Sequence, residues 1–248
     1  MAEIPYRRSP HPEIEARIHA ALASRRAAER QERPDRGLGL YLGEIGSCAR
    51  KLWAQMHGHP REDFDGSALV RFGMGSAAED LVVGWLVAAG YTIRRQQGRV
   101  LMQLDGDRAV SGHIDGEIWL EHSRFDVEPA ILEIKSANAE QFALCVAQGY
   151  DRWRPAYGDT IQAYMGASGV HVAMAVVLCK DNSRLYAEKL RFDPERYEGL
   201  KAKAEAVLTH ETALPRPAEA TSEYCQFCKW CHLRAECWGP TWDARFDP

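Results

Sequence analysis

Hydrophobic and polar residues alternate along this chain with two different periods, and the changes of period predict its elements. Apolar residues recur at helical spacing in residues 11–33, which predicts an amphipathic helix. A strongly apolar helix is expected over residues 72–89, ended by Gly90. Three later segments also show a helical pattern: residues 137–148, 159–167 and 194–210.

Short apolar runs bounded by turn residues predict the strands. These runs are residues 91–97, 99–104, 109–120, 128–135, 170–178 and 184–192. The run over 170–178 is continuous, which is typical of a strand buried on both faces. Strands interleaved with helices in this order predict an α/β core with a mixed central sheet flanked by helices.

The composition suits one large folded unit with additions at both ends. The chain has 248 residues, of which 46% are hydrophobic and 27% charged, within the range of one core domain. We expect an N-terminal arm over residues 1–36, a core over 37–214 and a tail over 215–248. No apolar run is long enough to span a membrane, and the N-terminus lacks the apolar segment of a secretory signal, so a cytoplasmic location is expected. The net charge of −4 argues against a generally basic surface for nucleic acid, but it leaves room for a local basic groove.

Two carboxylates and a lysine form the most distinctive polar group of the sequence. Asp115 lies between glycines in one predicted strand, and Glu133 and Lys135 end the next. Because residues two apart share a strand face, Glu133 and Lys135 point the same way. Mg²⁺ and Mn²⁺ prefer oxygen ligands and keep several waters. The carboxylates of Asp115 and Glu133 and the backbone carbonyl of Ile134 are therefore candidate ligands.

Further polar residues belong to this group only on particular interpretations. Glu79 lies at the edge of an apolar helix face, where it is either a further metal ligand or a glutamate that complements the helix dipole. Gln162 is a candidate for holding the nucleophile or a phosphate. Lys135 would orient or deprotonate an attacking water, or neutralise developing charge. Taken alone, an Asp and a Glu-x-Lys triplet more often form a surface ion pair.

Cysteines suggest a second site, because four of them crowd near the C-terminus: Cys225, Cys228, Cys231 and Cys237. Zinc and a [4Fe–4S] cluster both take four thiolates, and the spacing leaves both open. Ser47 is expected to cap a helix whose first turn contains Cys48, where the dipole stabilises a thiolate. Cys145 and Cys179 lie in apolar runs and are expected in the core.

Together these motifs resemble the PD-(D/E)XK nuclease superfamily. More narrowly, they are similar to its iron–sulfur exonucleases, related to the RecB and AddB nuclease domains and to CRISPR-associated exonucleases, with some phage-type features. The matching motifs, in chain order, are Ser47-Cys48-x-Arg50, Gly75-x3-Glu79, Gly112-x2-Asp115, Glu133-x-Lys135, Pro155…Gln162-Ala-Tyr164-Met165 and Cys228-x2-Cys231-x5-Cys237.

The resemblance implies a Mg²⁺- or Mn²⁺-dependent DNA exonuclease with a restriction-endonuclease-like core. The implied catalytic residues are Asp115, Glu133, Lys135, Gln162 and Tyr164, and the implied metal ligands are Glu79, Asp115, Glu133 and Ile134. It also implies a [4Fe–4S] cluster that joins the two ends of the chain, held by Cys48, Cys228, Cys231 and Cys237. Many relatives carry His where this chain has Glu79, so neither metal preference nor strand polarity is carried over.

The resemblance further implies single-stranded DNA or duplex ends as substrate, a bacterial or phage-infected cell as the location, and a recombination, phage or CRISPR-adaptation protein as partner. Two alternatives stay open: a catalytically inactive DNA-binding or partner-binding subunit, and a zinc-stabilised nuclease. Trp153 and Tyr157 are candidates for stacking on bases. Candidate contacts to the DNA backbone are Arg94, Arg95, Arg99, Arg152 and Arg154.

Overall fold

The computed structural model describes residues 12–32, 39–59, 64–123, 126–225 and 227–239. Its helices before the sheet are α1 (Pro12–Glu32), the 3-10 turn η2 (Leu42–Glu44), α2 (Ala49–Met56) and α3 (Gly66–Ala88). Its strands are β1 (Thr92–Arg94), β2 (Gly98–Gln103), β3 (Ala109–Ile114), β4 (Gly116–Ser123), β5 (Asp126–Ala137), β6 (Val172–Cys179) and β7 (Leu185–Arg191). The remaining helices are α4 (Ala139–Gln148), α5 (Tyr150–Trp153), α6 (Pro155–Ser168), α7 (Pro194–Thr209) and α8 (Arg234–Trp238).

Five strands form a central sheet in the order β1-β4-β5-β6-β7, and β2 pairs with β3 in a separate two-stranded sheet. Within the central sheet β5 and β6 run parallel, and the other neighbouring strands run antiparallel. The predicted α/β core with a mixed central sheet flanked by helices is therefore confirmed.

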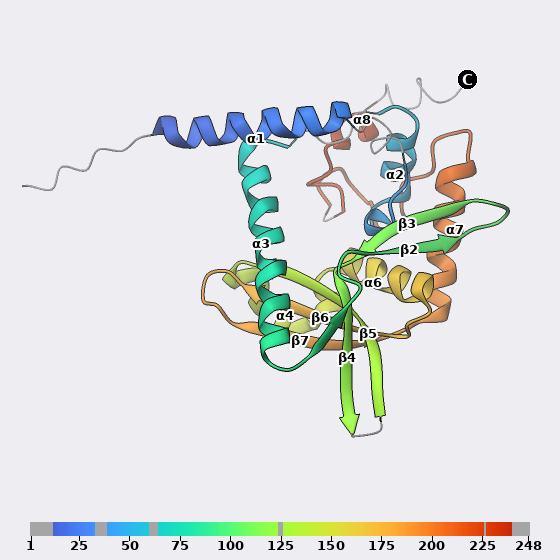
Figure 1. Ribbon diagram of the computed structural model, residues 1–248. Coiled ribbons are helices and arrows are strands. Elements are labelled where there is room, and N and C mark those ends of the chain that lie inside the picture. Colours follow the sequence, from blue (N-terminus) through green and yellow to red (C-terminus); the bar gives the residue numbers. More distant parts are fainter. Residues whose placement is uncertain (1–11, 33–38, 60–63, 124–125, 226, 240–248) are drawn as a thin grey trace, which may run out of the picture.

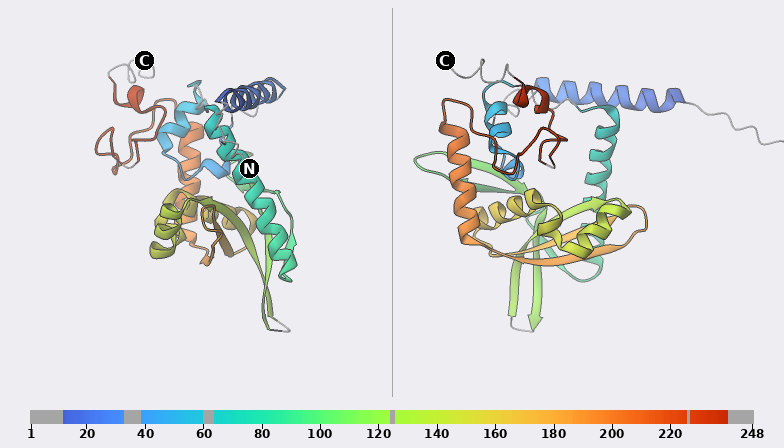
Figure 2. Two further views of the ribbon diagram at one scale, coloured as in Figure 1. Left: turned by 90° about the vertical axis from the view of Figure 1, so that its left-hand side faces the viewer. Right: turned by 180° about the vertical axis from the view of Figure 1, so that it is seen from behind.

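The two faces of the central sheet are covered by different helices (Figures 1 and 2). In β6, Ala173, Ala175 and Val177 join a core that includes residues of α4, α6 and α7, while Val172 and Val176 pack with Ala78 and Val82 of α3. Both faces of this strand are thus buried, as its continuous apolar sequence predicts.

Side chains that cap helices decide where several helices begin. Asp65 Oδ1 accepts a hydrogen bond from Ala68 N (2.7 Å), and Asn138 Oδ1 accepts one from Gln141 N (2.9 Å). Each cap satisfies an N–H that the helix itself leaves free. The prediction that the apolar helix begins at residue 72 is therefore wrong, because the Asp65 cap starts α3 at Gly66.

Three other expected boundaries are also wrong. The predicted strand 109–120 is two strands in different sheets, with Asp115 between them. The N-cap of α2 is Cys48 rather than Ser47. Helix α6 begins at Pro155 rather than at residue 159, because proline suits the first turn of a helix.

Helix α1 confirms the helix expected near the N-terminus, but its apolar side chains are not buried: Ile14 is 57% and Ile18 50% exposed. Residues 1–11 and 33–36 of the predicted arm, and residues 240–248 of the predicted tail, lie outside the described ranges. Within those ranges, no helix is both long and apolar enough to cross a membrane.

Gly112→Ala should destabilise the fold, because a Cβ at this position would lie 2.7 Å from Leu42 Cβ and 2.8 Å from Tyr164 Cε1. Overpacking of this kind costs about 1–3 kcal/mol, which urea unfolding would measure. Gly84→Ala is the matched control, since its Cβ would have no neighbour within 4 Å and alanine is favoured over glycine in a helix by about 0.8–1 kcal/mol. Equal stability of the two variants would contradict this packing.

Candidate active site

Asp115 lies where the chain passes from the two-stranded sheet into the central sheet, between β3 and β4. Its Oδ2 accepts a hydrogen bond from the backbone N–H of Ile134 (2.7 Å). Its backbone carbonyl accepts a longer one from Gln97 N (3.4 Å). The first residue of β4, Gly116, pairs with Leu132 of β5. The Asp115 carboxylate is thereby held against the Glu133-Ile134-Lys135 segment.

Glu133 and Lys135 share one face of β5, as their spacing predicts. The Glu133 side chain is only 5% exposed and that of Lys135 29%. The Lys135 ammonium contacts Glu133 Oε1 and donates a hydrogen bond to the Ile134 carbonyl (3.1 Å). Glu133 Oε1 and the Ile134 carbonyl oxygen are two of the three expected metal ligands. Both therefore contact the positively charged Lys135 ammonium.

Helix α3 contributes Glu79 to the same group. Its Oε1 accepts a hydrogen bond from Gln97 Nε2 (2.5 Å), in the connection between β1 and β2. Gln97 has a φ of 52°, in the left-handed region that glycine prefers. Gln97 therefore links Glu79 and Asp115. Nothing in the sequence pattern marks Gln97 as a residue of this site.

Burial and neighbouring charges shift the pKa values of Asp115, Glu79 and Lys135. Burial raises the pKa of Asp115 to about 7, and the negative charge of Glu133 adds to the effect. Burial also raises the pKa of Glu79, although Gln97 and Lys135 oppose the change. For Lys135, burial lowers the pKa, but the charges of Glu133 and Asp115 more than offset this and raise it. The site thus holds a surplus of carboxylates around one ammonium ion.

Three tyrosines surround this charged group. The Lys135 Nζ lies 5.6 Å from the ring centroid of the exposed Tyr157. Tyr150 packs against Tyr157 with ring centroids 6.2 Å apart. The Tyr150 hydroxyl is buried without a hydrogen-bond partner among the described residues, and burial followed by the charge of Glu133 raises its pKa. Tyr164 is buried behind β3 against Gly112, and burial and Glu133 likewise raise its pKa.

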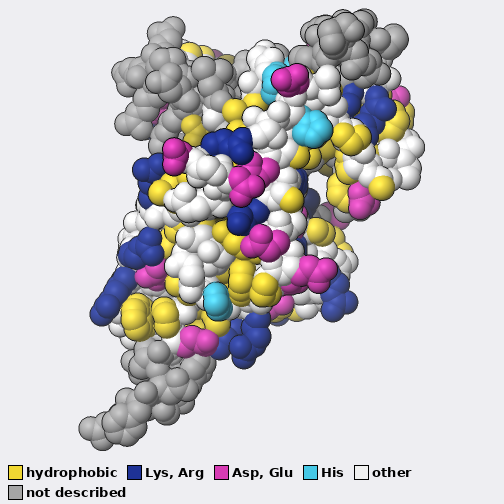
Figure 3. Space-filling view, turned by 90° about the vertical axis from the view of Figure 1, so that its right-hand side faces the viewer, with side chains coloured by type: hydrophobic (Ala, Val, Ile, Leu, Met, Phe, Trp, Pro, Cys, Tyr) yellow, Lys and Arg dark blue, Asp and Glu magenta, His cyan; other side chains and the backbone are white. Residues whose placement is uncertain are grey.

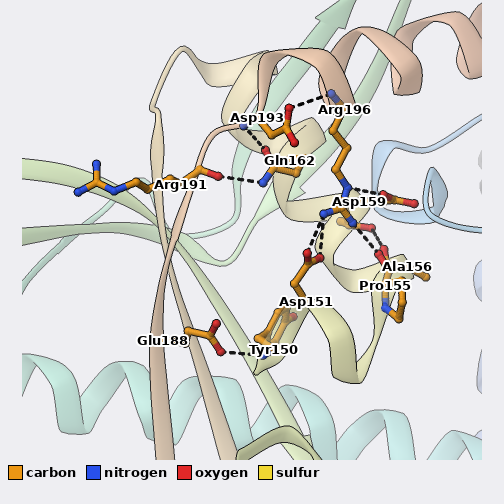
Figure 4. A network of polar contacts seen from close by, with 11 residues as sticks. Tyr150, Asp151, Pro155, Ala156, Asp159, Gln162, Glu188, Arg191, Asp193 and Arg196 are labelled. Atoms are coloured by element: carbon orange, nitrogen blue, oxygen red, sulfur yellow. Dashed lines mark hydrogen bonds and ion pairs between the residues drawn. The ribbon is translucent and has the colours of Figure 1, made fainter. Parts of the chain in front are cut away.

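Gln162 is not brought into this group. Its Nε2 donates to the Arg191 carbonyl (2.9 Å) and its Oε1 accepts from Asp193 N (2.9 Å), which fixes the turn between β7 and α7 (Figure 4). Gln162 is four residues from both Gly158 and Gly166, so the three share one helix face. A Cβ at Gly158 would collide with Asp151 and also with Arg196 of α7, and a Cβ at Gly166 would collide with the Tyr197 ring of α7. The Gln162 face of α6 is therefore the face that meets α7.

Arg196 fixes the same corner of the molecule (Figure 4). Its Nη1 donates to both carboxylate oxygens of Asp151 (2.9 Å each), and its Nε donates to Asp159 Oδ1 (2.8 Å). Since Tyr150 and Tyr157 lie beside these two aspartates in sequence, the ion pairs hold the aromatic part of the site in place.

The residues expected to contact DNA have mixed positions. Trp153 is only 8% exposed and donates from Nε1 to Gln141 Oε1 (3.2 Å), so the prediction that it stacks on bases is wrong. Arg95 pairs with Glu117 (2.5 Å), and Arg154 donates to Gln141 (2.9 Å). The Arg94 guanidinium lies over the Trp119 ring (4.8 Å to the centroid). The remaining two, Arg99 and Arg152, are exposed.

The cysteines from the two ends of the chain meet around one cavity. It is lined by Cys48 from the start of α2 and by Cys228, Cys231 and Cys237 from the tail, together with basic residues. Its basic residues are Arg50, Lys51, Arg216 and Arg234. Cys225 does not line the cavity, while Cys145 and Cys179 are buried in the core as expected.

Neither site has the compact side-chain geometry of a loaded metal centre. Among the described residues, no group of three or more His, Cys, Asp or Glu side chains lies close enough to hold a metal ion. In the carboxylate site, the Lys135 ammonium lies among the oxygens. In the cysteine cavity four thiols lie beside basic side chains. The positive charges of those side chains would stabilise the thiols as thiolates, the form that binds a metal or a cluster.

Comparison with known proteins shows the fold. No family model matches the sequence, and no curated protein is significantly similar. The crystal structure of SSO0001 is similar with a TM-score of 0.52 at 13% identity, covering 88% of this chain and 97% of that one. The shared α/β architecture is consistent with a restriction-endonuclease-like fold.

Two further similar structures are exonucleases. The alkaline exonuclease LHK-Exo from Laribacter hongkongensis has a TM-score of 0.49 at 13% identity, covering 71% of this chain and 88% of that one. A phage related exonuclease from Haemophilus somnus 129PT has a TM-score of 0.42 at 13% identity, covering 64% and 77%. At these TM-scores the likeness bears on neither activity nor site residues.

Asp115 should make stability depend on pH in the metal-free protein. Because its pKa is raised, the folded state binds more protons than the unfolded state between about pH 4 and 7, so the free energy of unfolding falls as pH rises through that range. Asp115→Asn removes this loss. Its stability relative to wild type should therefore be greater at pH 8 than at pH 5 by at least about 1.4 kcal/mol, the equivalent of one pKa unit.

Urea unfolding in a chelator at both pH values measures this difference. Asp107→Asn is the control, because Asp107 lies in an exposed turn, and it should keep the pH dependence of the wild type. The same pH dependence in Asp115→Asn would contradict the raised pKa.

Proposed function

We propose that this chain is a Mg²⁺- or Mn²⁺-dependent deoxyribonuclease, a DNA exonuclease of the PD-(D/E)XK type. The observation that supports this most directly is the convergence of Glu79, Asp115, Glu133 and Lys135. These residues come from α3, from the β3–β4 junction and from β5, and the pKa values of Glu79, Asp115 and Lys135 respond to the charges around them. A surplus of partly buried carboxylates is stabilised by a bound cation.

The residues at this site fit a hard divalent cation. Glu133 Oε1 and the Ile134 carbonyl face the same ammonium ion, and Asp115 is bonded to the backbone of the same segment. We propose Asp115, Glu133 and the carbonyl of Ile134 as ligands, with Glu79 as a further carboxylate. When bound, the cation would polarise a phosphate oxygen and lower the pKa of water.

Lys135 would act as a hydrogen-bond donor in hydrolysis. Its raised pKa keeps it an ammonium ion at neutral pH, so it can hold the attacking water or neutralise the charge that develops on the phosphate. The water oxygen then bonds to phosphorus and gives up a proton, the P–O ester bond breaks, and the leaving oxygen takes up a proton, so that the net reaction adds one water molecule. The buried Tyr150 hydroxyl is a candidate donor to the same phosphate.

Tyr164 and Gln162 have positioning roles in this proposal rather than direct contacts with substrate. Tyr164 supports the strand that leads to Asp115 by packing against Gly112. Gln162 fixes the β7–α7 turn through two backbone hydrogen bonds, and so holds α6 against α7.

We further propose that the cysteine cavity holds a [4Fe–4S] cluster through Cys48, Cys228, Cys231 and Cys237. The four thiols lie around one cavity although Cys48 is far from the other three in sequence. Such a group would link α2 to the tail. Zinc is the competing occupant, because it takes the same ligands.

Asp115→Ala and Lys135→Ala should each lower DNA hydrolysis at least 100-fold, the usual scale for losing a positioned catalytic group. End-labelled single-stranded and duplex DNA, with Mg²⁺ or Mn²⁺ added, measures both the rate and the polarity. Asp107→Ala and Lys180→Ala are matched controls, because both residues are exposed in turns. Undiminished hydrolysis in both site variants would contradict the assignment.

Cys231→Ala should lower the thermal stability and the folded yield, because a shared group would no longer connect the ends of the chain. Cys225→Ala is the control and should keep both, since Cys225 does not line the cavity. Visible absorption and elemental analysis of anaerobically purified protein identify the occupant. A colourless wild-type protein with stoichiometric zinc would show that the cavity holds zinc and not a cluster. Unchanged stability in Cys231→Ala would exclude a structural role for either group.

A further inference from the structure

Three aromatic side chains of the cysteine-rich tail stand out in solvent. Tyr224 is 69% exposed, Phe227 58% and Trp230 82%. Within the described ranges these are the largest exposures among the large hydrophobic side chains. Exposed apolar groups clustered within one short segment usually mark a binding surface. We call these three residues, together with Lys229 and Arg234, the tail platform.

Each end of the tail platform combines a ring with a cation. Lys229 Nζ lies 5.7 Å from the centroid of the Trp230 ring, and Arg234 Cζ lies 5.3 Å from that of Tyr224. Hydrophobic and charged side chains lie together on the lobe at the upper right of Figure 3. One nearby carboxylate, Glu236, is engaged by His59 Nδ1 (3.2 Å).

The backbone around the cysteines holds these rings on consecutive turns. Cys228 N and Lys229 N both donate to the Cys225 carbonyl (3.0 and 2.9 Å), and Cys231 N donates to the Cys228 carbonyl (2.9 Å). Phe227 also lines the cysteine cavity. The platform is therefore part of the folded cysteine-rich lobe.

The mixture of rings and cations favours one kind of partner. A protein interface with an aromatic core is usually depleted in lysine. Single-stranded nucleic acid needs flat apolar surfaces for its bases and cations for its phosphates, and such proteins combine the two. Duplex DNA offers its phosphates but keeps its bases stacked on each other.

We propose that the tail platform binds single-stranded DNA. Unpaired bases stack on Tyr224, Phe227 and Trp230, and Lys229 and Arg234 neutralise phosphates. The choice of DNA rests on the proposed nuclease function. The platform would hold the strand outside the carboxylate site, on the lobe that the four cysteines organise.

Fluorescence anisotropy of the full chain with a labelled thymidine oligonucleotide of about 20 nucleotides tests this, without added divalent cations. Trp230→Ala should weaken binding about tenfold, within the range measured for loss of one stacking ring, and Trp230→Phe should restore most of it. Lys229→Gln should reduce the slope of log affinity against log salt by about 0.7, the value for one phosphate of a single strand.

Trp85→Ala is the matched control, because Trp85 is a half-exposed tryptophan on α3, and it should bind as wild type does. Affinity for a blunt duplex should be the same in Trp230→Ala and wild type. Absence of binding in the wild type, unchanged affinity in Trp230→Ala, or an equal loss in Trp85→Ala would overturn the proposal.

The platform and the proposed nuclease fail separately. Hydrolysis of bis(p-nitrophenyl) phosphate, which is too small to reach from the carboxylate site to the tail, should be unchanged in Trp230→Ala. If the wild-type chain hydrolyses no phosphodiester but Trp230→Ala weakens its binding to single-stranded DNA, the tail platform is supported and the nuclease function is contradicted. If the wild-type chain is a nuclease but Trp230→Ala binds single-stranded DNA as tightly as wild type, the tail platform is contradicted and the nuclease function is supported.

Discussion

The hydrogen bond from Ile134 N to Asp115 Oδ2 is the interaction on which the candidate site depends. It ties the point where the chain changes sheets to the strand that carries Glu133 and Lys135. A strand that continued straight through Asp115 would stay in one sheet. The break frees the Asp115 carboxylate to turn toward β5, and the bond fixes it there. Glu79 of α3 then joins these charged residues through its hydrogen bond with Gln97.

The sequence predicts most of the elements but not the change of sheet. Between Val110 and Leu120 every second residue is buried, and this alternation runs through Asp115 without a change of phase. Periodicity therefore cannot distinguish one long strand from two strands in two sheets. The pairing of Glu133 with Lys135 was predictable, because it depends only on the two-residue repeat of a strand. The link through Gln97 was not, since it depends on a loop conformation with positive φ. The position of Gln162 could have been found, because its spacing from Gly158 and Gly166 marks a face that admits a close neighbour.

Two polar systems meet at helix α6 and divide its surface between them. One face carries Tyr157 and Tyr164 toward the carboxylates, and the opposite face meets α7 through Gln162 and the Arg196 ion pairs. Helix α7 in turn packs on α2, where Trp53 Nε1 donates to the His210 carbonyl (2.8 Å) and Arg50 Nη1 to the Leu214 carbonyl (2.7 Å). The carboxylate site and the cysteine lobe are thus joined by packed helices, although they share no side chain among the residues that the structure describes.

The parallel pairing of β5 with β6 has a consequence for the order of folding. Parallel neighbours need a long crossover, and here that crossover contains α4, α5 and α6 with all three site tyrosines. Closing this crossover costs conformational entropy, and the chain loses that entropy before the β5–β6 pairing can stabilise it. The carboxylate strand can form early with its antiparallel neighbour β4, whereas the aromatic half of the site is completed only when the distant strand docks. We therefore expect the β4–β5 pair that carries Glu133 and Lys135 to form before the tyrosines of α5 and α6 pack beside it.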